Sequence, residues 1–259
     1  ARGHMEIANA LIAAGADWTL DEHHRVEQID APPVLGIDDL DAVQKGDIAV
    51  IKRLIDEHAD INAKCGSDRT ALMFVAEKGL VEVARVLIEA KADINAANDA
   101  GQTALTYAAF KAHTPMVTCL LEANATLDLA HGHVSALMFA AYSGSKDIMN
   151  TLIDARAQLD ARDKKRMTPL HYAVLGDQAE AARLLIDAKA SLNEEDSNKQ
   201  TALLCAIRDG RANVAKVLIE AKASLSDPND ALLTSATVGN AGVVQFLIDM
   251  KAAPDTRDN

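Results

Sequence analysis

The chain has 259 residues and a formal net charge of −12 at pH 7, which argues against a nucleic-acid-binding protein, since such proteins need a basic face. Hydrophobic residues make up 49% of the chain, yet no apolar run approaches the roughly 20 residues of a membrane span, so we expect no membrane insertion. Three cysteines, at positions 65, 119 and 205, are too scattered for a disulfide framework and favour a reducing compartment, the cytoplasm or the nucleus.

The N-terminal segment differs from the rest of the chain. Residues 1–4 have no pattern and are interpreted as a cloning remnant. Residues 5–19 match one amphipathic helix, the second half of the two-helix unit that follows, and residues 20–36 form a charged, proline-containing insertion. We therefore treat 5–36 as an N-terminal half-repeat with its insertion. Either the protein continues further upstream, or this single helix acts as a lid.

From residue 37 to residue 254 the chain repeats a unit of about 33 residues. A Leu–Ile or Leu–Leu pair marks each unit and begins at positions 54, 87, 120, 152, 185, 218 and 247. The seven predicted units are 37–64, 65–97, 98–129, 130–162, 163–195, 196–226 and 227–254. Residues 255–259 are expected to fray. Such self-similarity predicts a stacked array of units in place of one central core.

Each unit combines a short helix, a tight turn and a longer helix. The longer helix carries apolar residues at i, i+3, i+4 and i+7, as in Val83, Val86, Leu87 and Ala90. One unit cannot bury this stripe by itself, so neighbouring units must stack. A side-chain oxygen that can cap the short helix precedes it at Thr70, Thr103, Ser135, Thr168, Thr201 and Asp230.

These units resemble the ankyrin repeat. The resemblance rests on the sequence TPLH at 168–171, on the tails ADIN at 59–62 and 92–95, and on the period near 33. It implies an all-α fold, an ankyrin-repeat solenoid of helix–turn–helix units with short β-hairpin or loop fingers. It also implies that His171 braces the neighbouring loop by hydrogen bonding. The resemblance says little about the partner, because a fold does not dictate a function.

The resemblance also identifies backbone positions that ankyrin repeats usually fill with glycine. After the second helix this chain has other residues, for which we predict a left-handed conformation: His58, Lys91, Asn124, Arg156, Lys189, Lys222 and Lys251. In the turn between the helices Gly79, Gly144, Gly210 and Gly239 keep the glycine, whereas Ala112 and Asp177 replace it. We therefore expect the third unit, which contains Ala112, to be locally irregular.

The sequence contains no recognised catalytic motif. There is no P-loop, no HExxH, no CxxC and no GxSxG. His131 and His133 could hold a metal, but no third ligand is evident nearby, and exposed loop histidines explain them more simply. Cys119 and Cys205 are expected in the packed interior, which leaves Cys65, in a finger, as the one candidate reactive thiol. We expect no enzymatic activity, no metal site and no cofactor.

The candidate partner site follows from the positions that line the concave face of ankyrin-like arrays. In the fingers these positions are Arg69, Gln102, Val134, Met167 and Gln200, and late in the first helices they are Glu77, Phe110, Tyr142, Leu175 and Arg208. Both rows are polar at their ends and apolar in the middle, which is typical of a binding hot spot. We predict a partner site at Phe110, Tyr142 and Leu175, with Val134 and Met167 alongside. The alternative is that these side chains pack against neighbouring helices.

A second candidate site is a basic run on the fifth finger, formed by Arg162, Lys164, Lys165 and Arg166. It could bind an acidic segment or a phosphate of a partner. A solvated charge run beside Asp160 and Asp163 is an equal alternative.

The predicted function is a non-enzymatic, monomeric protein–protein interaction scaffold that binds another protein through its concave face and fingers. Two alternatives stay open. The chain could be an inhibitory or targeting subunit of an enzyme, or the ankyrin part of a larger enzyme or channel. Asn62 and Asn95 also lie in tails that resemble those modified by asparaginyl hydroxylases in this family.

Overall fold

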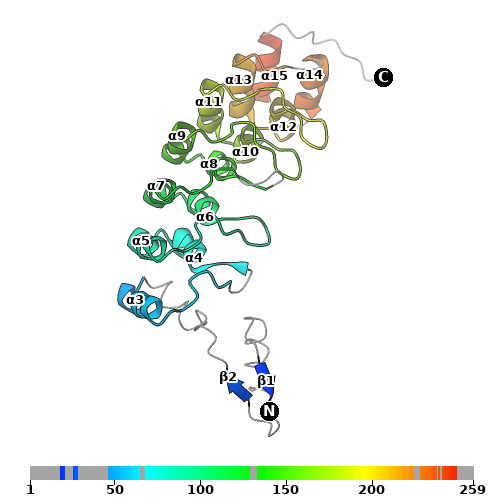
Figure 1. Cartoon of the computed structure of the whole chain (residues 1–259). Helices are drawn as coiled ribbons and strands as arrows, with labels where there is room; N and C mark the ends of the chain where they lie inside the picture. The colour runs from blue at the N-terminus through cyan, green and yellow to red at the C-terminus, as the bar shows by residue number, and fades with distance from the viewer. Residues whose placement is uncertain are drawn as a thin grey trace.

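The computed structural model describes residues 18–20, 26–28, 46–64, 68–128, 133–224, 228–237, 239 and 241–249. Within these ranges thirteen helices follow one another, and from α4 onward they form helix–turn–helix pairs (Figure 1). Their bounds are α3 Ile48–Asp56, α4 Ala71–Lys78, α5 Val81–Glu89, α6 Ala104–Phe110, α7 Thr114–Glu122, α8 Ala136–Ser143, α9 Lys146–Asp154, α10 Pro169–Leu175, α11 Ala179–Asp187, α12 Ala202–Arg208, α13 Ala212–Glu220, α14 Pro228–Thr237 and α15 Ala241–Asp249.

The pairs stack into a solenoid, which confirms the predicted fold class. The first helices α4, α6, α8, α10 and α12 form one row, and the second helices α5, α7, α9, α11 and α13 form a row beside it (Figure 1). The loops that join successive pairs project from the side of the first helices (Figure 1). These loops are the fingers.

One short sheet was not predicted from the sequence. Strand β1, Trp18–Leu20, pairs antiparallel with β2, Val26–Gln28, so that Thr19 lies opposite Glu27. The other residues of the proposed half-repeat and insertion lie outside the described residues, as does the first helix expected in the first unit.

The core is a continuous row of small and branched apolar side chains. Each second helix from α5 onward buries the i and i+4 residues of its predicted stripe, for example Leu87, Leu120 and Leu152, which are at most 1% exposed. Several of the predicted i+3 and i+7 residues, such as Val86 and Ala90, are only half-buried. The first helices are buried on several sides because they lie between neighbours, and alanines such as Ala108 and Ala140 allow that close approach. Each unit thus depends on the next for burial, as the sequence period predicted.

Side-chain caps form at several of the predicted positions. Thr103, Ser135 and Thr201 each accept a hydrogen bond from the backbone N–H three residues later, at 3.3 to 3.4 Å. The prediction for Asp230 is wrong, since α14 already begins at Pro228. Proline is favoured in the first turn of a helix, because the N–H that it lacks would have no partner there. In the shortened connection between the sixth and seventh units, the helix therefore begins at Pro228, before the predicted cap.

The left-handed residues after the second helices are confirmed at six of the seven predicted positions, and Lys251 lies outside the described residues. Their φ angles run from 61° to 76°. At Lys91 the N–H donates to the carbonyl of Ile88 at 3.0 Å, and the N–H of Ala92 donates to that of Leu87 at 2.9 Å. This is the Schellman arrangement, which closes the helix at the expense of strain in a residue with a Cβ.

The replacement of Lys91 by Gly is therefore expected to raise the free energy of unfolding by about 1 kcal/mol, because glycine adopts this φ without strain. Thermal unfolding followed by circular dichroism measures the change. Lys52→Gly is the matched control. Lys52 is exposed within α3, where glycine should lower stability by about as much. A melting temperature that falls in Lys91→Gly contradicts the assigned conformation.

The expected irregularity in the third unit is wrong. Ala112 adopts a φ of 59° and Asp177 a φ of 55°, the same region that Gly79 occupies at 72°. In the third unit the N–H of His113 donates to the carbonyl of Ala108 at 2.9 Å, as in the units that keep the glycine. Stacked neighbours on both sides hold the helices in place, so Ala112 takes up the strain locally.

A ladder of side-chain acceptors joins successive units. Asn62 Oδ1 accepts from the N–H of Asp93 at 2.7 Å, and Asn95 Oδ1 accepts from the N–H of Thr126 at 2.7 Å. Later junctions repeat this bond with Asp128, Asp160 and Asn193 as acceptors. One side chain per unit thus fixes the spacing to the next, and this is the structural role of the two ADIN asparagines.

A finger face with bonded ends and an apolar middle

The candidate site combines one finger residue and one first-helix residue from each of five units. The two residues are eight positions apart, as in Arg69 and Glu77 or Met167 and Leu175. We call this surface the finger face, and its residues are Arg69, Gln102, Val134, Met167, Gln200, Glu77, Phe110, Tyr142, Leu175 and Arg208.

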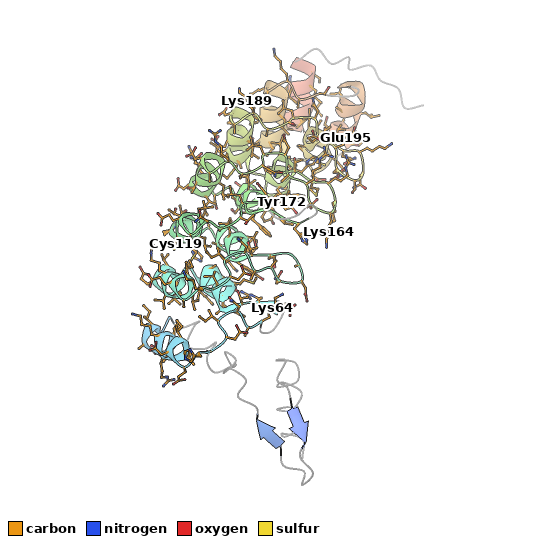
Figure 2. The ribbon with its side chains drawn as sticks, viewed as in Figure 1. Lys64, Cys119, Lys164, Tyr172, Lys189 and Glu195 are labelled. Atoms are coloured by element: carbon orange, nitrogen blue, oxygen red, sulfur yellow. The ribbon has the colours of Figure 1, made fainter. Side chains whose placement is uncertain are left out.

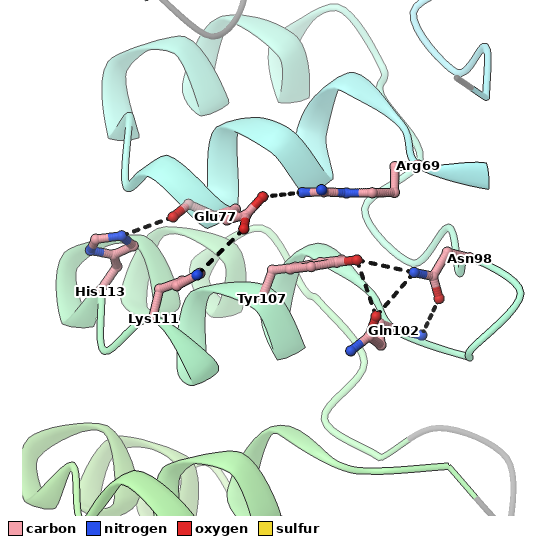
Figure 3. Close-up of polar contacts among 7 residues, drawn as sticks. All are labelled: Arg69, Glu77, Asn98, Gln102, Tyr107, Lys111 and His113. Carbon is pink, nitrogen blue, oxygen red and sulfur yellow. Dashed lines mark hydrogen bonds and ion pairs between the residues drawn. The ribbon is translucent and has the colours of Figure 1, made fainter. Parts of the chain in front are cut away.

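At the N-terminal end of the finger face, the side chain of Arg69 is engaged in contacts with other residues of the chain. Its guanidinium bonds to the carboxylate of Glu77 (Figure 3). Its Cζ lies 4.0 Å from the ring centroid of Phe74 and 4.5 Å from that of Tyr107. Lys111 Nζ lies 3.5 Å from the other oxygen of Glu77. The bond from Arg69 holds the pKa of Glu77 below its usual 4.5. This cluster joins the second unit to the third and leaves little of Arg69 for a partner.

Gln102 belongs to the same network. Its Oε1 accepts from the hydroxyl of Tyr107 at 3.1 Å, and Asn98 Nδ2 donates to both, also at 3.1 Å (Figure 3). His113 adds a further cross-unit contact, because its Nε2 lies 3.0 Å from the carbonyl oxygen of Glu77 (Figure 3). The polar N-terminal third of the finger face is therefore held by internal bonds, although the buried Nε of Arg69 has no hydrogen-bond partner among the described residues.

The C-terminal end is bonded in the same way. Arg208 donates to Gln200 Oε1, which is its finger partner eight positions earlier, and to both carboxylate oxygens of Asp209, at 2.8 and 3.2 Å. The bond with Asp209 raises the pKa of Arg208, so its charge is fixed and already compensated.

The middle of the finger face is apolar and open. Phe110 and Tyr142 are each 44% exposed and Leu175 is 41% exposed, whereas most large apolar side chains of the described residues are buried. Phe110 does contact the next unit, since its ring centroid lies 5.2 Å from that of Phe139 at an angle of 63°. The packing alternative thus holds in part for Phe110, yet much of the ring stays accessible. Val134 and Met167 are half-buried beside these residues.

Comparison with known proteins agrees with the stacked helix–turn–helix units. A family profile described as ankyrin repeats in three copies matches residues 40–131 and 137–230, well over half of the chain. The chain belongs to the ankyrin repeat family.

Among solved structures, the human ASB11 ankyrin repeat domain is similar to this ankyrin repeat protein. The TM-score is 0.71 and the sequence identity 23%, over 84% of this chain and 98% of that chain. At this identity the likeness shows the fold alone. A search of curated proteins finds no match.

The TPLH motif of this ankyrin repeat protein forms the brace that the resemblance implied. His171 Nδ1 accepts from the N–H and the hydroxyl of Thr168, at 3.2 and 2.9 Å, and Nε2–H donates to the carbonyl of Gln200 at 3.1 Å. These partners fix one neutral tautomer. Burial lowers the pKa of His171, which keeps the ring uncharged. Its role is structural, because it joins the fifth unit to the sixth finger.

In the structure, the four residues of the basic run on the fifth finger fall into two groups, one paired with an acidic residue and one without an ion pair. Arg162 bonds to Glu194 of the next unit, so its charge is taken up between two fingers. Lys164, Lys165 and Arg166 are exposed, and none of them forms an ion pair with another described residue. Sequence reasoning missed this division, because Glu194 lies 32 positions after Arg162.

The remaining chemical candidates lie in the interior or outside the described residues. Cys119 and Cys205 are buried, and burial raises the pKa of Cys119 and that of Cys205, the latter to about 11, so both stay protonated at neutral pH. Cys65 and His131 lie outside the described residues. Where the chain is described, no group of three or more His, Cys, Asp or Glu side chains could hold a metal. None of the described helices is long and apolar enough to cross a membrane.

Proposed function

We propose that this ankyrin repeat protein is a non-enzymatic interaction module that binds another protein through the apolar middle of its finger face. Ankyrin repeats are protein-interaction modules as a family. The observation that carries the proposal is the exposure of Phe110, Tyr142 and Leu175 at the same position of three successive units. Exposed aromatics surrounded by polar groups are typical of binding hot spots, since a partner removes their apolar area from water.

The bonded ends of the finger face support the same assignment. Arg69 and Arg208 already hold acidic or amide partners of this chain, so a ligand gains little from them. The energy of binding should therefore come from the three open apolar side chains. We also propose that the protein acts as a monomer in the cytoplasm or the nucleus, where its buried thiols Cys119 and Cys205 stay reduced.

Affinity capture from a cell lysate, quantified by mass spectrometry, tests the proposal. The double variant Phe110→Ala/Tyr142→Ala is expected to weaken partner binding by about 2 kcal/mol or more, roughly 30-fold in Kd. The matched control is Ile248→Ala, because Ile248 on α15 is 41% exposed but lies outside the finger face. Full retention of every partner by a folded double variant contradicts the proposal.

A further inference from the structure

A pocket lies between the fifth and sixth fingers, beside the apolar middle of the finger face. Its volume is about 220 Å³, and its lining includes Lys165, Met167, Leu175, Asp196, Cys205 and Arg208. Small-molecule sites usually occupy roughly 300–1,000 Å³. The pocket is therefore too small for most metabolites and has room for one large side chain.

Apolar and neutral side chains make up most of the pocket lining, and its charged residues are Lys165, Asp196 and Arg208. Met167 and Leu175 supply apolar area, and the buried Cys205 and His171 are both neutral. Asp196 is the acidic residue of the lining, and its Oδ1 already accepts from the N–H groups of Asn198 and Gln200, at 2.8 and 2.9 Å. An apolar side chain fits this surface better than a charged one, because burial of an unpaired charge is costly.

The two fingers that form the pocket are tied together. The N–H of Ser197 in the sixth finger donates to the carbonyl of Lys165 in the fifth at 2.8 Å. The ion pair of Arg162 with Glu194 makes a second link. A ligand therefore meets a preformed site and does not have to order these loops, which lowers the entropic cost of binding.

Around the pocket, the charged side chains at the finger tips are basic, whereas the acidic side chains turn inward or lie at the base of a finger. Asp163 of the fifth finger turns inward, where it accepts from the N–H groups of Lys165 and Met167 and from the hydroxyl of Tyr172, at 2.7 to 3.0 Å. The finger tips instead carry four exposed cations that form no ion pair within the described residues, Lys164, Lys165, Arg166 and Lys199. The exposed acid Glu195 lies at the base of the sixth finger, where its backbone pairs with that of Thr201.

We infer that fingers five and six bind an extended segment of the partner protein in which Asp or Glu residues flank one large apolar side chain. This assignment rests on the proposed function and names the chemistry of the partner. The apolar side chain enters the pocket between Met167 and Leu175, and the carboxylates lie on the lysines of the two finger tips. The chain has a net charge of −12, so most of its surface repels an acidic segment. The cationic finger tips attract such a segment and direct it to this site.

The arrangement favours carboxylates over phosphate. Bidentate recognition of phosphate relies on arginine, and of the arginines near the pocket Arg162 and Arg208 are occupied by acidic residues of this chain, which leaves Arg166 as the one arginine without an ion pair among the described residues at the finger tips. The lysines are spread over two fingers and are point charges, which suits several separate carboxylates better than one doubly charged group.

A selection from a random 12-residue peptide library displayed on phage, with the full chain as bait, tests the inference. Enriched peptides should carry net negative charge and one large apolar residue. Their Kd, measured by fluorescence anisotropy, should rise about 10-fold in Lys164→Glu/Lys165→Glu and should rise with ionic strength. Lys189→Glu/Lys222→Glu makes the same charge change at the residues that follow the second helices α11 and α13, and should alter Kd less than about 2-fold. Lys189 lies away from Lys164 (Figure 2).

Other outcomes overturn the inference. The inference fails if the enriched peptides are neutral or basic, or if no peptide is enriched. It also fails if the finger variant and its control bind the peptides with equal Kd, or if the large apolar residue of the peptide can be replaced by Gly without a loss of affinity. Replacement of the carboxylates by phosphoserine that tightens binding more than about 10-fold assigns the site to phosphate instead. Peptides insensitive to the finger variant but lost with Phe110→Ala/Tyr142→Ala overturn this inference and leave the proposed function standing.

Discussion

Replacement of Leu152 by Ala is expected to lower the free energy of unfolding by about 3 kcal/mol. Leu152 is 0% exposed in α9, which packs against α7 on one side and α11 on the other. The loss combines the apolar area of the side chain with the cavity that it leaves. Neighbouring units are rigid helix pairs, so the cavity cannot collapse easily. Urea unfolding followed by circular dichroism measures the change.

Leu175→Ala is the matched control, since it removes the same atoms from a side chain that is 41% exposed. We expect it to cost less than about 1 kcal/mol, because a surface leucine gains little from burial. Equal losses in the two variants would place Leu175 in the core and would remove one of the three residues on which the binding proposal depends. The pair of variants thus tests the core and the finger face together.

Much of the fold could be predicted because it follows from local rules repeated seven times. The spacing of Leu87, Leu120 and Leu152 gave the stacked helices, and the residues after the second helices gave the left-handed positions. The stacked helices depend on the hydrophobic period, which is visible in the sequence, and the left-handed positions followed from the resemblance, which marks the places where ankyrin repeats usually have glycine. The error at Asp230 arose because a shortened connection changes where a helix begins, which a repeat alignment does not show.

The candidate site could be predicted only in outline. The positions of Phe110, Tyr142 and Leu175 followed from the resemblance, and the structure leaves them open. The bond from Arg69 to Glu77 and the link from Arg162 to Glu194 were not foreseen. Such pairs depend on side-chain rotamers and on how one unit is set against the next, which no sequence period specifies. The pocket between the fingers has the same origin, since it needs residues from two units.

His171 is expected to make stability depend on pH below about 6.5. Its ring is 1% exposed, and burial lowers its pKa from the ordinary 6.5. Above pH 6.5 the ring is neutral in both the folded and the unfolded chain, so its contribution is fully present. As the pH falls below 6.5, the unfolded chain binds a proton that the folded chain resists. Stability should then fall by up to about 1.4 kcal/mol per pH unit until the folded pKa is reached.

His171→Leu isolates this contribution, because Leu204 occupies the same position of the next unit and shows that the fold accepts leucine there. At neutral pH the variant should lose about 1–3 kcal/mol, since the carbonyl of Gln200 and the N–H of Thr168 lose their partner. Urea unfolding of both proteins between about pH 7.5 and 5 should show the difference shrinking toward acid. Glu77, whose pKa is lowered from 4.5, titrates below this window and is common to both proteins. Parallel pH curves would mean that the folded chain protonates the buried ring as readily as the unfolded chain does, and the lowered pKa assigned to His171 would be wrong.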